Sequence, residues 1–521
     1  MQAKQFTHFC AIFFVLMPIS YGNLPLKRFS GEKKQMEKST AVKTEFTGKN
    51  IALFIFACIG ACLCGINVSG IAALFTEVQA DLHIGEVDAG WILSIYSLIT
   101  YPSMILIGRI GDLIGFKKAV ILSCLTFAVG SVGVAVSSSI APIIIFRAVQ
   151  AIGGGGLPTA SMSLVAKIFP TNRQKMMGLA VNVFPLAQII GSNYGVLVAR
   201  LTGSWRGIYW VNVVLMAISI ILFLLFMPKS EKSSDISWKQ IDFLGAALMC
   251  AAVCCLMEAI TQLKEFGQEL GRSSSTGMIW LKMGLWFAGF VILGVLFIIR
   301  VKKAKHPIVD REVLFNKKFA SVTAFFFVYG FVALGMAQMI PSFAQKVYGF
   351  NSDMAAFVVM AKGIGWFLVG LIVAALIKKL GYRYPLLICI FIIAASYILF
   401  AILSKNTFPQ PAGLSDYAKG FWWLFLLAAV LGAGSGMASP TMTNCAVDLM
   451  PENVGTIYGV TAAFRQIGST LCVPIVTVIV ALSGKTGDAS GAAHGFRISF
   501  LLMAALILIC LPGALITAQH L

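Results

Sequence analysis

The sequence predicts an all-α membrane protein with fourteen transmembrane helices, arranged as two six-helix bundles with two extra central helices. Three observations lead to this fold class. Of the 521 residues, 58% are hydrophobic and only 12% are charged, which leaves too little polar surface for a soluble domain of this length. Fourteen apolar runs are long enough to cross a bilayer as helices, which satisfy their own backbone hydrogen bonds in lipid. A weak repeat relates the first six runs to the last six.

The apolar runs are separated by polar loops. They cover residues 51–75, 89–107, 119–136, 142–166, 177–199, 208–227, 241–261, 280–299, 319–340, 354–377, 385–403, 421–446, 456–482 and 496–518. The repeat rests on two basic turns, 108–118 after run 2 and 378–383 after run 10. We therefore predict a cytoplasmic tail (1–49), an N-terminal six-helix half (50–228), a linker with two extra transmembrane helices (229–300) and a C-terminal six-helix half (301–521). Parallel halves of this kind are typical of secondary transporters.

The first 49 residues allow three interpretations. The apolar stretch 9–19 has eleven residues, fewer than the roughly 20 of a spanning helix, and has the length of a signal-peptide core. Translation could instead begin at Met36. The seven Lys and Arg residues of 25–49 favour a cytoplasmic tail, because basic segments collect on the inner side of a membrane.

The distribution of basic residues predicts the orientation of the chain. With the amino terminus inside, 26 Lys and Arg residues lie in cytoplasmic segments and 10 in exterior loops. This bias agrees with an even number of spans and with both termini on the cytoplasmic side of the cell membrane. The net charge of +19 therefore reflects orientation and does not indicate a nucleic-acid partner.

The turn GRIGDLIGFKK at 108–118 joins two apolar runs that must be antiparallel neighbours. Its basic residues place it in the cytoplasm, and its glycines allow two helices to approach closely. We expect Asp112 to lie near the start of the next helix, where free N–H groups favour a carboxylate. An ordinary basic membrane loop is the alternative. The predicted motif residues are Gly108, Arg109, Gly111, Asp112, Gly115, Lys117 and Lys118.

Four ionisable side chains lie well inside predicted spans, where each costs at least ~2.5–3.5 kcal/mol on insertion scales. Arg147, with Gln150 one turn further on the same face, either lines a substrate or coupling path or holds span 4 through neighbouring carbonyls. Lys362 is either a substrate contact or a buried amine held by a carbonyl, and Arg465 either contributes to the path or is architectural. Glu258 is a possible proton carrier, with pairing to a neighbouring helix as the alternative.

Other classes of function lack support in the sequence. It contains no catalytic constellation, metal-ligand spacing or nucleotide-binding loop, so we predict no enzymatic activity, no metal and no cofactor. All cysteines except Cys10 lie in apolar runs, where a thiol behaves as a small hydrophobic group. With three cations and few acids inside the spans, an anionic or zwitterionic substrate fits better than a lipophilic cation.

Several motifs resemble the major facilitator superfamily, in the family's order, across residues 50–518. The turn 108–118 is similar to its cytoplasmic signature, and FRAVQAIGGGG (146–156) to its arginine motif of span 4. The stretches 205–212 and 431–468 resemble the fourteen-span drug:proton antiporters, the multidrug efflux branch. The resemblance implies the major facilitator fold, alternating access, and a cytoplasmic latch that includes Arg109 and Asp112.

Three departures from that family's pattern bear on proton coupling. The span-5 stretch Gly191–Val196 lacks the proline and one glycine of the antiporter signature. Asn67 stands at the position of the usual span-1 aspartate and cannot titrate. In the second half, Lys378 stands where the repeat would place an aspartate.

The predicted function is export of an amphipathic small molecule, a drug-like compound or metabolite, in exchange for protons, by a monomer in the lipid bilayer. One alternative is a facilitator or symporter for an anionic metabolite or siderophore. An alternative of another class is a non-transporting membrane receptor or scaffold with a transporter fold. The predicted cavity and coupling residues are Asn67, Arg147, Gln150, Lys362 and Arg465.

Overall fold

The computed structural model describes residues 45–84, 86–227, 242–269, 277–305, 307, 309, 311, 316–402, 420–451, 453–483 and 489–511. The helical bundle belongs to the unit Thr47–Leu521. Almost all of the predicted tail lies outside the described residues. The predicted boundaries between tail, halves and linker stay predictions.

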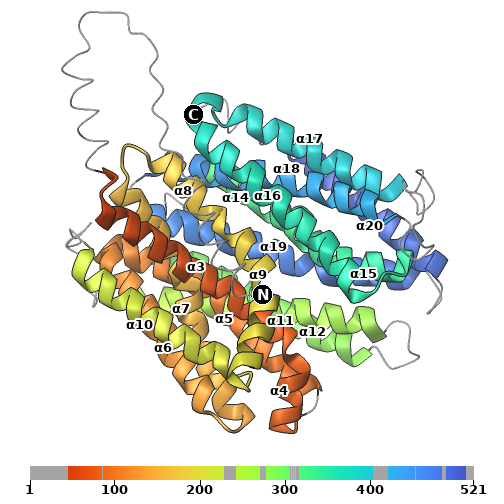
Figure 1. Cartoon of the computed structure of the whole chain (residues 1–521), viewed down its shortest axis with the longest axis horizontal. Helices are drawn as coiled ribbons and strands as arrows, with labels where there is room; N and C mark the ends of the chain where they lie inside the picture. Colours follow the sequence, from red (N-terminus) through yellow and green to blue (C-terminus); the bar gives the residue numbers. More distant parts are fainter. Residues whose placement is uncertain are drawn as a thin grey trace, which may run out of the picture. The chain divides into compact units, whose positions relative to one another are not determined.

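The helices fall into two groups, with a pair that comes between them in the sequence (Figure 1). The first helix group contains α3 (Gly48–Ala73), α4 (Phe75–Leu82), α5 (Glu86–Ile114), α6 (Phe116–Val136), α7 (Ile140–Ile168), α8 (Arg173–Val181), α9 (Val183–Thr202) and α10 (Gly207–Phe226). The pair is α11 (Phe243–Glu269) and α12 (Gly277–Lys303). The second helix group contains α14 (Lys317–Tyr329), the π-helix η2 (Gly330–Gly335), α15 (Met336–Tyr348), α16 (Ser352–Leu380), α17 (Arg383–Ile402), α18 (Phe421–Leu449), α19 (Val454–Ser483) and α20 (Ala489–Ile509).

The predicted all-α membrane fold is confirmed. Within the described residues, 13 helical segments are long and apolar enough to cross a membrane, with α14, η2 and α15 counted as one. The predicted run 177–199 is the one outside that set. It is divided at Asn182 into α8 and the 20-residue α9, which carries the polar residues Gln188 and Asn193.

Close helix packing in the first helix group depends on the four glycines of α7. A Cβ at Gly153 would come within 2.5 Å of the Phe127 backbone nitrogen of α6, and one at Gly155 within 2.9 Å of the Met104 nitrogen of α5. Where lipid replaces water, small residues are what allow helices to approach this closely. The glycine run of span 4 is therefore a packing element that holds α7 between α5 and α6.

The two extra helices differ in how they pack. Helix α11 contacts α5 of the first group and α19 of the second, and its Met257 and Ile260 are buried with Tyr101 and Ile467. Helix α12 contacts α11 and leaves nearly all of its apolar surface exposed. In this unit α11 thus packs against both α5 and α19 beside their contact with each other.

Candidate functional site

A carboxylate from α5 joins the two helix groups at one end of the bundle. Asp112, in the last turn of α5, accepts the backbone N–H groups of Gly455 (3.0 Å) and Thr456 (2.6 Å). These residues form the first turn of α19, where free N–H groups and the helix dipole favour a negative charge. Gly455 allows the close approach, because a Cβ on it would lie 2.6 Å from the Gly108 carbonyl oxygen. We call these four residues the first latch.

The first latch partly corrects the expectation for the basic turn. Asp112 binds a helix N-terminus, but that helix is α19 and not the next one, because Gly115 (φ 100°) turns the chain away into α6. Lys117 donates to the Met227 carbonyl (2.9 Å) at the end of α10 and so stays within the first group. Arg109 is buried beside Asp112 and stabilises its charge, whereas Lys118 is exposed.

A second set of polar residues joins the groups at the same end. The Arg173 guanidinium pairs with the Asp448 carboxylate, which also accepts the Gln174 side-chain amide (2.8 Å) and the Tyr382 hydroxyl. Asn444 donates to the Gln174 carbonyl at 2.9 Å. Burial, together with the Asp448 carboxylate that accepts its O–H, raises the pKa of Tyr382 above its usual range. We call Arg173, Gln174, Tyr382 and Asp448 the second latch.

The second latch was not predicted, although the repeat held a signal for it. Helix α8 is the start of the divided run 177–199, and α19 is the start of the run 456–482. Both latches therefore lie where a helix of one group starts beside the other group. At the position equivalent to Asp112, Lys378 donates to the Thr171 carbonyl just before α8. A lysine cannot accept N–H groups, and the carboxylate here comes from Asp448 of α18 instead.

The structure brings Asn67, Arg147 and Gln150 together inside the first helix group. Arg147 is 0% exposed, and its Nη1 donates to Asn67 Oδ1 (2.8 Å) and Gln150 Oε1 (2.9 Å). Its Nε donates to the Ile92 carbonyl (3.1 Å), and its Cζ lies 4.5 Å from the centre of the Tyr96 ring. All three bonds go to neutral groups, and the buried Arg147 Nη2 has no hydrogen-bond partner among the described residues. Carbonyl anchoring and membership of a polar network are thus both seen for Arg147.

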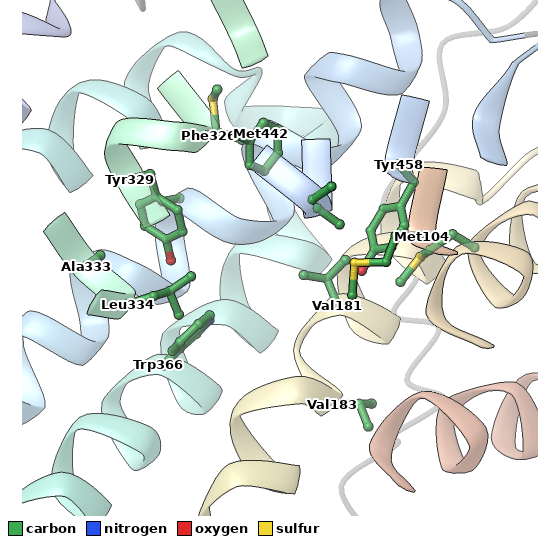
Figure 2. Packing of buried hydrophobic residues seen from close by; sticks show 14 of the residues in the cluster. Met104, Val181, Val183, Phe326, Tyr329, Ala333, Leu334, Trp366, Met442 and Tyr458 are labelled. Carbon is green, nitrogen blue, oxygen red and sulfur yellow. The ribbon is translucent and has the colours of Figure 1, made fainter. Parts of the chain in front are cut away.

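Lys362 lies inside the second helix group against the π-helix. It is 5% exposed, its Nζ donates to the Ala333 carbonyl of η2 (2.7 Å), and it lies 5.5 Å from the centre of the Trp366 ring. Figure 2 shows Trp366 with Tyr329, Ala333 and Leu334 on one side of the buried cluster. In this conformation Lys362 is thus a buried amine held by a carbonyl. π-Turns of this type are frequent at functional sites.

The remaining two charged candidates lie on α19 and α11. Arg465 is 6% exposed and packs against η2, since a Cβ at Gly330 would lie 2.9 Å from Arg465 Cα. Glu258 is half-buried on α11 near Cys254 and Cys255. The predicted cavity and coupling residues therefore lie at two buried centres, one around Arg147 and one around η2. Their roles in transport stay predictions.

Comparisons with known proteins agree with this architecture. The model of the Major Facilitator Superfamily matches residues 57–472. Multidrug resistance protein 3 of Bacillus subtilis (strain 168) is 26% identical over 450 residues, 84% of this chain and 83% of that protein. Multidrug transporter protein MdtP of the same strain is 22% identical over 463 residues, 88% of this chain and 78% of that protein.

A solved structure supports the same fold. The crystal structure of the E. coli fucose:proton symporter FucP aligns with a TM-score of 0.59 at 14% identity, over 91% of this chain and 100% of that chain. At this identity the likeness concerns the fold alone. The family match covers most of the sequence and most of the helices described above. The chain therefore belongs to the Major Facilitator Superfamily and is a multi-pass membrane transporter, not an enzyme.

Proposed function

We propose that this transporter exports amphipathic small molecules in exchange for protons, by alternating access as a monomer. Both latches and both termini then lie on the cytoplasmic side, in agreement with the 26 to 10 bias of basic residues. The first and second helix groups rock against each other around a site near the middle of the membrane.

The observation that carries this proposal is the pair of latches. Asp112 binds the start of α19, and Arg173 binds Asp448 at the end of α18, so each contact crosses from one helix group to the other. Access from this end requires both contacts to break. Charge-assisted hydrogen bonds are strong enough to stabilise a closed state. Because these contacts are partly exposed, they are also weak enough to break when the protein opens.

The names of the relatives support the substrate class. Two of them are called a multidrug resistance protein and a multidrug transporter. Identities of 26% and 22% leave the substrate of this chain a proposal. Arg147, Lys362 and Arg465 are buried in the helix groups, while Glu258 lies on α11 outside them, which favours a substrate with a negative charge.

A facilitator or symporter for an anionic metabolite is the second candidate. It is favoured by Asn67, which accepts the Arg147 Nη1 at 2.8 Å and cannot exchange a proton. A proton antiporter with this fold would need its titrating group at a position other than Asn67.

Flux into proteoliposomes tests the proposal. The purified full chain is reconstituted and offered a panel of fluorescent aromatic anions, cations and neutral compounds, with and without an imposed pH gradient. Antiport predicts accumulation that needs the gradient and stops when an ionophore collapses it. Equal flux in the collapsed state would favour the facilitator, and absence of flux for every compound would contradict both in favour of a non-transporting protein.

A further inference from the structure

We propose that Lys362 and Trp366 form a subsite for the acidic group of an aromatic organic anion, such as an arylcarboxylate. This inference rests on the proposed transport function and narrows its substrate class.

The Lys362 ammonium has hydrogen-bonding capacity that the protein leaves unused. An ammonium carries three donors, and in the described part of the chain one of them is taken, by the Ala333 carbonyl. Lys362 is 5% exposed and has no ion-pair partner among the described residues. A buried charge is ordinarily paired, because desolvation otherwise makes it costly. The two remaining N–H groups are thus available to an anionic ligand.

Trp366 supplies a second donor beside the first. It lies four residues after Lys362 on α16, which places both side chains on the same face of the helix. Its side chain is 3% exposed, and its indole Nε1–H has no partner within the described residues. An indole nitrogen only donates, so this group also needs an acceptor. A carboxylate offers two oxygens and can accept from both residues at once.

The surroundings fit an aromatic body attached to that acidic group. Figure 2 places Tyr329, Leu334 and Trp366 in the same buried cluster, so the residues around the two donors are aromatic and aliphatic. On α19, whose backbone at Arg465 packs against Gly330 of η2, the Arg465 Nε is also buried without a partner among the described residues. Donors with unused capacity thus gather around η2, whereas Glu258 lies on α11, outside both helix groups.

Binding need not remove Lys362 from the π-helix. The ammonium can keep its bond to Ala333 while its other two N–H groups point to the ligand. Tyr397 independently donates to the neighbouring Val332 carbonyl at 2.5 Å. Two side chains, from α16 and α17, therefore hold η2 in place, and the Lys362 bond can persist when a ligand binds.

The test compares 1-naphthoate with 1-naphthamide, which match in shape and differ in charge. Their affinities for the full chain in lipid nanodiscs are measured by ligand-dependent shifts of the unfolding temperature and by tryptophan fluorescence. We expect the wild type to bind the carboxylate about tenfold more tightly than the amide or better. Lys362→Met should abolish the preference, Lys362→Arg should keep part of it, and Trp366→Phe should reduce it several-fold. Lys346→Met, an exposed lysine of the same helix group, should behave as wild type.

Equal affinities in the wild type, no binding of either compound, or an unchanged preference in Lys362→Met would overturn the subsite. If Lys362→Met does not give a monodisperse folded protein, Lys362→Arg and Trp366→Phe decide. The outcome is separable from that of the flux experiment. Gradient-driven flux of neutral or cationic compounds, together with no binding preference for naphthoate, would contradict the subsite but not the transport proposal. A preference for naphthoate with no flux of any compound defeats the transport proposal and leaves the subsite standing.

Discussion

Asp112 accepts the backbone N–H of Thr456 at 2.6 Å, so a carboxylate at the end of α5 holds the first turn of α19 in the opposite helix group. Asp112→Asn removes the charge that the helix N-terminus favours, at a cost of about 1 kcal/mol to the latched state. We expect the Gly455 and Thr456 amides to exchange hydrogen about fivefold faster or more, as followed by mass spectrometry of peptides that cover 450–460. Asp353→Asn, an exposed carboxylate in the first turn of α16, is the control and should leave this exchange unchanged.

The second latch should behave as one unit, because Asp448 accepts from Tyr382 and pairs with Arg173. Tyr382→Phe and Asp448→Asn both weaken the same hydrogen bond. Their combined effect on the free energy of unfolding should therefore fall short of the sum by about 1 kcal/mol. Denaturant unfolding of the wild type, the two single variants and the double variant in one detergent measures this difference in free energy. Lys379→Ala, at an exposed position near the end of α16 and three residues before Tyr382, should instead add fully to Asp448→Asn. Full additivity of Tyr382→Phe with Asp448→Asn would show that the hydroxyl does not stabilise the closed end.

Hydropathy was sufficient to predict the helical bundle. Each spanning helix satisfies its own backbone hydrogen bonds, so it can be recognised from its length and apolar composition alone. It could not predict the break at Asn182 or the π-helix at Gly330–Gly335, which depend on packing against neighbouring helices. Helical spacing alone placed Gln150 beside Arg147. The second latch was missed because Arg173 and Asp448 lie 275 residues apart.

The expected exterior end offers a pH test that is independent of the latches. Asp81 accepts from the Arg206 guanidinium and from the Trp205 indole N–H (3.1 Å), and these bonds lower the pKa of the Asp81 carboxyl. A lowered folded-state pKa stabilises the protein above the ordinary carboxyl pKa, and this stability is lost as pH falls through the folded value. Because the Asp81 side chain is 44% exposed, Asp81→Asn should cost less than about 1 kcal/mol at pH 7. Unfolding measured from pH 7 down to pH 3 should show the gap to wild type closing, whereas a gap that widens in acid would contradict the assignment.

Two substitutions at Asn67, the hydrogen-bond acceptor of the buried Arg147, should change the free energy of unfolding in opposite directions. Asn67→Asp places a carboxylate where a neutral oxygen now accepts from Arg147 Nη1 at 2.8 Å. A charge-assisted bond is about twice as strong as its neutral equivalent, so this variant should raise the unfolding free energy at pH 7 by about 1 kcal/mol or more. Asn67→Leu has nearly the same size but leaves the guanidinium short of one acceptor, and should lower the unfolding free energy by about 1–3 kcal/mol. If both variants destabilise equally, the fit of the side chain and not the charge of Arg147 governs this centre. A stabilised Asn67→Asp whose advantage disappears in acid would show that a titrating group is accommodated there.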